Sequence, residues 1–341
     1  GHRAMASQCG RRNLRGRQGT ALLLGLFLAA FALLPSAFRD LASAQGESRP
    51  VTLVVGFPAG SGTLDAIARI MREWLARKWM QPVIVDNIPG LSGSAAAETV
   101  FRAPPDGRTL LITPPGLLTI ARHLQPLAFD PDQFVRVSLL ATTPIVLVAR
   151  RDLPAADLRE LVAYAREHPG KLMAANQGQG STSHLTAERL RVAAALDIAH
   201  VPFRGSVAAL QGLTDGRVDL MFDNLGSSLA AIESGQVKVL AVVSQAREPA
   251  LPNVATVAEL LPGFVSSTWV AVIAPSKTPR HIADRLSADF VEGVTQPDVA
   301  GRFRQNGCEP VGMTPEDTAA FVRAETETWT KVVKTRGFRL D

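Results

Sequence analysis

The chain has 341 residues, 46% of them hydrophobic and 20% charged, which excludes a disordered or collagen-like chain and provides apolar side chains for one or two cores. The formal charge of +5 comes from one end, because residues 1–44 hold six arginines and one acid, while the rest carries 30 basic and 30 acidic residues. A neutral body lacks the basic patch that nucleic acid requires, so we exclude nucleic acid as a partner.

Residues 1–44 have the pattern of a cleavable signal peptide. Arg11 and Arg12 precede the uncharged apolar run 21–34, and Ala42-Ser43-Ala44 offers a cleavage site. The 14-residue run is shorter than the ~20 residues that span a bilayer. We expect export to the periplasm, with the Sec and Tat routes both open because Arg11-Arg12 resembles a twin-arginine signal. Residues 1–4 precede Met5 and are interpreted as a vector-derived remnant.

The first part of the exported chain alternates between strand and helix patterns. Residues 51–55 form a β-branched apolar run that ends in a glycine-rich segment, and apolar residues then recur at helical spacing from Ile67 to Leu75. We predict further strands at 82–86 and 109–113 and a helix at 94–101. This βαβα order predicts a parallel sheet.

The alternation continues through the rest of the chain. The predicted strands are 145–148, 172–175, 218–222, 237–243 and 269–274. The predicted helices are 158–165, 184–196, 208–213 and 225–233. Thr278-Pro279 and Thr314-Pro315 each place a cap residue before a proline at the first position of a helix, so the C-terminal third is predicted to be mostly helical.

Two loops suit a small anion. Gly60-Ser61-Gly62-Thr63 joins a predicted strand to a helix N-terminus, and residues 176–183 do the same in the second half while adding three hydroxyl groups. Helix N-termini present free N–H groups and the positive end of the helix dipole. Two such loops facing one cleft could hold a carboxylate, although each loop alone also fits a tight connection between strand and helix.

The first loop leaves an enzyme as an alternative. Gly56, Gly60 and Gly62 have the spacing of a dinucleotide-binding loop, and Asp86 follows Gly62 by 24 residues, where a ribose-binding acid would lie. Such short-chain dehydrogenases resemble one another in a catalytic Tyr-x-x-x-Lys, whereas Tyr164 here has His168 four positions later. The sequence has no nucleophile-elbow or zinc-protease motif, so we predict no enzyme, cofactor or metal, and keep an NAD-dependent oxidoreductase as the alternative.

Taken together, the segments resemble the Bug family of periplasmic solute-binding receptors of tripartite tricarboxylate transporters. The resemblance covers nearly the whole exported chain and rests on the order and number of modest matches. These lie at 54–69, 81–87, 105–111, 180–185, 200–205, 216–224, 251–259 and 274–279.

The resemblance implies an α/β, two-lobed periplasmic binding protein of the Venus-flytrap, type II-like class, with a ligand cleft between the lobes. Lobe 1 would comprise residues 45–146 and 270–341, and lobe 2 residues 147–269. Crossing strands at 145–148 and 269–273 would form the hinge. The ligand would be a small di- or tricarboxylate or an aromatic or aliphatic acid.

Site residues carried over from the resemblance and from the two loops come from four segments. They are Phe57, Ala59, Gly60, Ser61, Thr63 and Asp65; Ser181, Thr182, Ser183 and His184; Phe203, Arg204 and Gly205; and Asp223 and Asn224. Asp65 lies one residue farther from Phe57 than the family pattern, and Phe203 and Arg204 replace a usual tyrosine and lysine, which suggests a less polar or differently oriented ligand.

The resemblance also implies partners. The closed receptor would dock on the membrane permease subunits of a tripartite tricarboxylate transporter, and a sensor protein is a further candidate partner. We expect a monomer.

Overall fold

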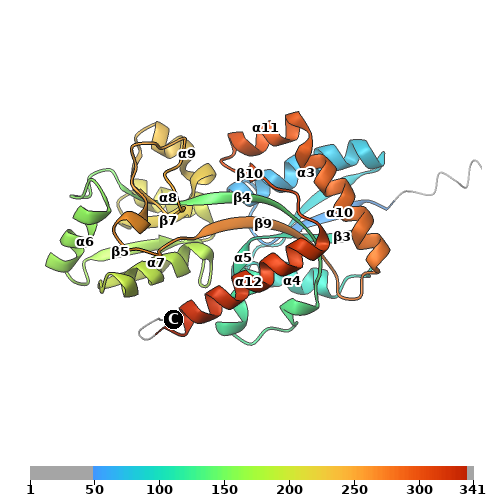
Figure 1. Ribbon diagram of the computed structural model, residues 1–341, viewed down its shortest axis with the longest axis horizontal. Coiled ribbons are helices and arrows are strands. Elements are labelled where there is room, and N and C mark those ends of the chain that lie inside the picture. Colours follow the sequence, from blue (N-terminus) through green and yellow to red (C-terminus); the bar gives the residue numbers. More distant parts are fainter. Residues whose placement is uncertain (1–48, 336–341) are drawn as a thin grey trace, which may run out of the picture. The chain divides into compact units, whose positions relative to one another are not determined.

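The computed structural model describes residues 49–335, which form a mixed α/β fold around one ten-stranded sheet (Figure 1). The predicted signal peptide lies outside the described residues. Within residues 49–335, no helix is both long and apolar enough to cross a membrane.

The sheet has two halves that share one long strand, β4 (Val135–Arg150). Up to Pro144 this strand pairs with β9 (Ser267–Ala274), and from Ile145 it pairs with β7 (Leu220–Asn224). The strand order is β2-β1-β3-β9-β4-β7-β5-β6, with β8 and β10 also paired to β4. We call the half that contains β1 lobe 1 and the half that contains β5 lobe 2.

Lobe 1 has the parallel strands that the βαβα pattern predicts, with β1 between β2 and β3. Its core combines residues from strands and helices, for example Leu53, Ile67 and Phe290. Besides β4 and β9, its elements are β1 (Val51–Val55), β2 (Val83–Asn87), β3 (Thr109–Thr113), β10 (Glu309–Pro310), α3 (Thr63–Trp79), α4 (Ser94–Phe101), α5 (Pro115–Thr119), α10 (Arg280–Thr295), α11 (Pro297–Gln305), α12 (Pro315–Val333), and the 3₁₀ turns η1 (Leu91–Gly93), η2 (Ala121–His123) and η3 (Pro131–Gln133).

Lobe 2 repeats the arrangement with β5 between β6 and β7, all parallel. It has its own core, which includes Leu147, Leu161 and Phe222. In Figure 1 its helices lie at the end of the sheet away from α3, α10 and α11. Besides β7, its elements are β5 (Leu172–Asn176), β6 (Ile198–Pro202), β8 (Val237–Val242), α6 (Leu158–Glu167), α7 (Thr182–Ala193), α8 (Ser206–Thr214), α9 (Leu225–Glu233) and the turn η4 (Val257–Glu259).

Most predicted elements are confirmed to within a few residues, and the differences have local causes. Strand β6 was not predicted, because Ile198–Pro202 is a half-exposed edge strand without a continuous apolar run. Helix α7 ends at Ala193 and not at 196, since Ala195 takes a left-handed backbone conformation with φ of 52°. The Thr314 cap is confirmed by the bond it accepts from the Asp317 N–H, but α10 begins at Arg280 with Pro279 as its cap residue.

Candidate functional site

Loops at the carboxyl ends of parallel strands from both lobes line two cavities. The inner cavity has a volume of about 40 Å³ and the outer one about 520 Å³, and both are lined by Phe57, Ser92 and Gln177. Loops in this position are the usual ligand-binding elements of open α/β sheets. The site is therefore a cleft whose walls belong to two lobes.

The second predicted loop contributes most directly to the inner cavity. Ser181, Thr182 and Ser183 line it at the start of α7. The Ser181 hydroxyl accepts a hydrogen bond from the His184 N–H at 3.2 Å, and the Ser183 hydroxyl donates to the Phe222 carbonyl. The first N–H groups of a helix have no partner inside that helix, so those of Thr182 and Ser183 are placed to bind an acceptor in the cavity.

His184 lies behind this loop. Its side chain is buried, its Nδ1 accepts the Gly180 N–H at 3.0 Å, and its ring packs edge-on against His200. His184 lines neither cavity, and its hydrogen bond with Gly180 stabilises the loop from behind.

Asp223 joins α8, α9 and the loop after β5 at the wall of the inner cavity. Its carboxylate accepts hydrogen bonds from Ser206 at 2.6 Å, Ser228 at 2.7 Å and Gln177 at 2.5 Å. Burial raises its pKa to about 6, although these hydrogen bonds and one from the Asn224 N–H favour the charged form. Asn224 lines the same cavity at the start of α9.

The first predicted loop is arranged differently. Phe57 lines both cavities, but Ala59 and Gly60 are exposed and line neither. Asp65 is buried beneath the loop, where it accepts hydrogen bonds from the Gly60 N–H, Arg69 and Asn87 at 2.8–2.9 Å. Burial opposes ionisation of Asp65, but these three donors outweigh it and lower its pKa. Asp65 therefore shapes the loop from behind.

The N-terminus of α3 meets lobe 2 directly. The Thr63 N–H donates to the Ser227 Oγ of α9 at 3.2 Å, and the two hydroxyls lie 2.9 Å apart. Ser61 packs against Gly205, since a Cβ built on that glycine would lie 3.3 Å from the Ser61 Cβ. Neither Ser61 nor Thr63 lines a cavity.

Phe203, Arg204 and Gly205 line the outer cavity. The Phe203 ring, however, points into lobe 2, because its Cζ would lie 2.7 Å from a Cβ built on Gly212 of α8. This close packing is a sufficient physical reason for a ring without a hydroxyl at this position. Arg204 and Asp223 are the only charged residues among the described residues that line the two cavities.

Several lining residues escaped the sequence analysis. Those of the inner cavity are Ser92, Pro114, Gly116, Leu117, Ile145, Phe222 and Thr268. Pro114 directly follows β3, just as the glycine-rich loop follows β1. A turn at the carboxyl end of a predicted parallel strand was therefore a signal that could have located this part of the lining. Leu91 and Ser92 have φ values of 49° and 53°, which non-glycine residues rarely adopt. No sequence pattern predicts this conformation.

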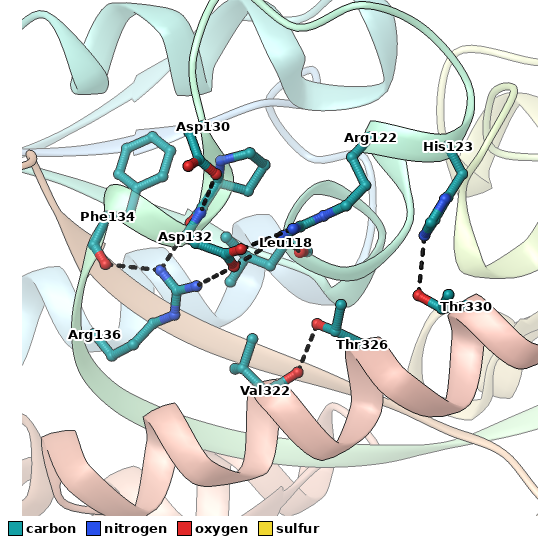
Figure 2. Close-up of polar contacts among 11 residues, drawn as sticks. Leu118, Arg122, His123, Asp130, Asp132, Phe134, Arg136, Val322, Thr326 and Thr330 are labelled. Carbon is teal, nitrogen blue, oxygen red and sulfur yellow. Dashed lines mark hydrogen bonds and ion pairs between the residues drawn. The ribbon is translucent and has the colours of Figure 1, made fainter.

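A larger groove of about 710 Å³ lies elsewhere on lobe 1, between the start of β4 and α12 (Figure 2). Several charged groups in or beside this groove have partners. Arg122 pairs with Asp132, the Arg136 guanidinium donates to the Pro131 and Phe134 carbonyls, and Arg280 pairs with Glu316. We place the candidate ligand site in the cleft and not in this groove, because residues of both lobes line the cleft, whereas the groove is lined by lobe 1 alone.

The two lobes, the crossing strand and the cleft define an extracytoplasmic solute-binding protein fold. Residues 67–338 match the family model described as tripartite tricarboxylate transporter family receptor, and the chain belongs to this family. The chain is 40% identical over 307 residues to a UPF0065 protein of Pseudomonas sp. (strain P51), covering 89% of this chain and 91% of the relative.

Solved structures agree with this assignment. The structure of R. palustris Rpa4515 with adipate is 34% identical with a TM-score of 0.81, and covers 85% of this chain and 98% of its own. The structure of the periplasmic binding protein BugD is 32% identical with a TM-score of 0.81, and the match covers 86% of this chain and 99% of BugD. The resemblance to the Bug family and the two-lobed α/β fold are thus confirmed.

The family consists of solute-binding receptors and not of enzymes, so the dehydrogenase alternative is wrong. The structure gives a physical reason for the misleading glycine pattern. Gly62 allows Ser227 to approach the α3 N-terminus, because a Cβ at this position would lie 2.8 Å from the Ser227 Oγ. Of the three glycines, Gly62 therefore serves a contact between lobes, whereas Gly56 packs against Gly93 within lobe 1.

Proposed function

We propose that this chain is a monomeric periplasmic receptor that captures a small carboxylate and delivers it to the permease of a tripartite tricarboxylate transporter. Residues 1–44 would direct export, by the Sec or the Tat route. The observation that carries the proposal is the inner cavity, which the serine and threonine residues at the N-terminus of α7 line together with residues of lobe 1. The adipate in Rpa4515 supports a carboxylate as the ligand class.

In this proposal the ligand carboxylate accepts hydrogen bonds from the N–H groups of Thr182 and Ser183 and from the hydroxyls of Ser181 and Thr182, since the Ser183 hydroxyl donates to the Phe222 carbonyl. Hydrogen bonds to a charged group contribute about 1.5–3 kcal/mol each, so several neutral donors can hold an anion without an arginine. The body of the ligand would extend toward Phe57 and the outer cavity, where Arg204 supplies the single positive charge of the lining. This arrangement favours an acid with an apolar body, either aliphatic or aromatic.

Ligand capture would close the lobes by rotation about β4 and β9, near the predicted lobe boundaries at 146/147 and 269/270. A ligand closes the cleft only if it binds the closed form more tightly, and groups from both lobes in one cavity lining supply that difference. The closed form would then dock on the permease. A sensor protein that recognises the same closed form is a second candidate partner, and pull-down against both separates them.

A thermal-shift screen of C4 to C10 mono-, di- and tricarboxylates and aromatic acids tests the proposal. A ligand that binds only the folded protein raises its melting temperature, by an amount that grows with the logarithm of the ligand concentration divided by Kd. We expect at least one acid to raise it, with one ligand bound per chain and no turnover. Failure of every acid in the screen, together with a shift by uncharged solutes, would overturn the carboxylate assignment.

A further inference from the structure

The first turn of α9 makes an unusually close contact with lobe 1. A Cβ built on Gly226 would lie 1.6 Å from the Asn306 carbonyl oxygen, and one built on Gly307 would lie 2.5 Å from both the Gly226 Cα and N. Real Cβ atoms essentially never approach other atoms this closely, so the two backbones touch because both residues are glycine. The 306–307 turn connects α11 to β10, which places it in lobe 1.

The next residue of the same turn makes the second contact. Ser227 accepts the Thr63 N–H at 3.2 Å and lies 2.9 Å from the Thr63 hydroxyl. Helix α3 has glycine at its own N-cap position and no side-chain cap from its own lobe. Ser227 thus does for α3 what an N-cap residue normally does, but from the opposite lobe.

The lobe 1 side of this contact is tied to the crossing strand. The Thr143 hydroxyl donates to the Gly307 carbonyl at 2.9 Å, and Thr143 lies two residues before the point where β4 passes from one half of the sheet to the other. Neither Gly226 nor Ser227 lines a cavity. A substitution at Gly226 or Ser227 would therefore act on the contact between the lobes without removing a residue of the cavity lining.

We propose that the first turn of α9 is a closure seat, in which Gly226 and Ser227 act as positioning residues that hold lobe 2 against lobe 1 in the ligand-binding arrangement. The inference rests on the proposed function, because it states that these residues determine what fraction of the protein molecules is competent to bind ligand. Apparent affinity falls in proportion to that fraction. The seat thus sets ligand affinity from outside the ligand site.

The test compares Gly226→Ala with Gly301→Ala, a helical glycine of α11 whose Cβ would meet nothing within 4 Å. Alanine favours a helix at both positions, so a loss seen only at 226 reports the contact and not helix propensity. Small-angle X-ray scattering of the ligand-free proteins should show a larger radius of gyration for Gly226→Ala alone. Calorimetry with adipate should show an affinity at least about tenfold weaker for the same variant, through the smaller competent fraction.

Ser227→Ala keeps the inference testable if Gly226→Ala fails to fold. Its matched control is Ser234→Ala, an exposed serine just after the same helix. We expect faster hydrogen exchange at the first turn of α3 in Ser227→Ala, with adipate affinity about fivefold weaker, as the loss of one hydrogen bond implies.

The outcomes separate the two proposals. If wild type binds no carboxylate while Gly226→Ala expands the ligand-free protein, the seat stands and the proposed ligand class fails. Unchanged scattering in a folded Gly226→Ala protein and unchanged α3 exchange in Ser227→Ala would overturn the closure seat, whatever the ligand.

Discussion

The two loops predicted to bind the ligand have the same place in the two lobes but different structural roles. Both follow the first parallel strand of their lobe and precede a helix, α3 or α7. The loop before α7 lines the inner cavity with three hydroxyl-bearing residues. In the loop before α3, the helix N-terminus donates to Ser227, and Phe57 is its one residue that lines the inner cavity.

This difference shows what a glycine-rich loop at a helix N-terminus can and cannot reveal. The pattern locates backbone N–H groups that need an acceptor, because the first turn of a helix leaves them unpaired. It does not say whether the acceptor is a ligand or another part of the protein. In this protein the N-terminus of α7 is proposed to bind the ligand, whereas the N-terminus of α3 donates a hydrogen bond to Ser227.

Substitution of one glycine in each loop should produce the largest contrast. Gly180 and Gly60 both have positive φ values, 76° and 71°, but a Cβ at 180 would lie 1.9 Å from a Leu124 methyl group, whereas a Cβ at 60 would meet nothing within 4 Å. We expect Gly180→Ala to reduce the free energy of unfolding by about 2–4 kcal/mol, from strain plus overpacking. Gly60→Ala should cost about 1 kcal/mol from backbone strain alone.

Urea unfolding and adipate calorimetry on the two variants measure this contrast. Leu124 belongs to lobe 1, so Gly180→Ala should also weaken binding by holding the second loop away from it. Equal losses in the two variants would contradict the view that position 180, and not position 60, is packed against the other lobe.

The two buried acids of the cleft should respond to pH in opposite directions. Asp223 has a pKa raised by burial to about 6, so its contribution to stability is full below about pH 3.8 and is lost as pH rises through 6. Asp65 has a lowered pKa, so its contribution is present above pH 3.8 and is lost as pH falls through its folded pKa. The difference of about two pKa units at Asp223 corresponds to about 3 kcal/mol.

Unfolding of Asp223→Asn and Asp65→Asn, each measured against wild type from pH 3 to pH 8, tests the signs. The stability of wild type relative to Asp223→Asn should decrease between pH 4 and pH 7. Relative to Asp65→Asn it should increase from pH 3 to pH 5 and then stay constant. Parallel curves for the two variants would show that the environments of the two acids do not differ as described.

Sequence alone could predict most of the fold and the general place of the site. Strands β1, β2 and β3 followed from apolar runs, and their parallel pairing followed from the helices between them. Which side chains face the cleft could not be predicted, because that depends on pairs distant in the chain, such as Thr63 with Ser227. Asp65 illustrates the limit, since Gly60 and Arg69 are its neighbours in the chain, whereas its third donor, Asn87, lies 22 residues away and is brought to it by the fold.

The smallest expected contrast concerns one serine from each loop, and it tests the difference between the loops most directly. Ser183 lines the inner cavity and donates to the buried Phe222 carbonyl, whereas Ser61 packs against Gly205 outside both cavities. Ser183→Ala should weaken adipate binding about tenfold, equivalent to about 1.4 kcal/mol, because the cavity wall loses its bond to Phe222, and should lower stability by about 1 kcal/mol. Ser61→Ala should change affinity less than about twofold, since it removes no contact from the cavity lining. Calorimetry on both variants decides the matter, and a larger loss of affinity in Ser61→Ala would mean that the first loop, and not the second, holds the ligand.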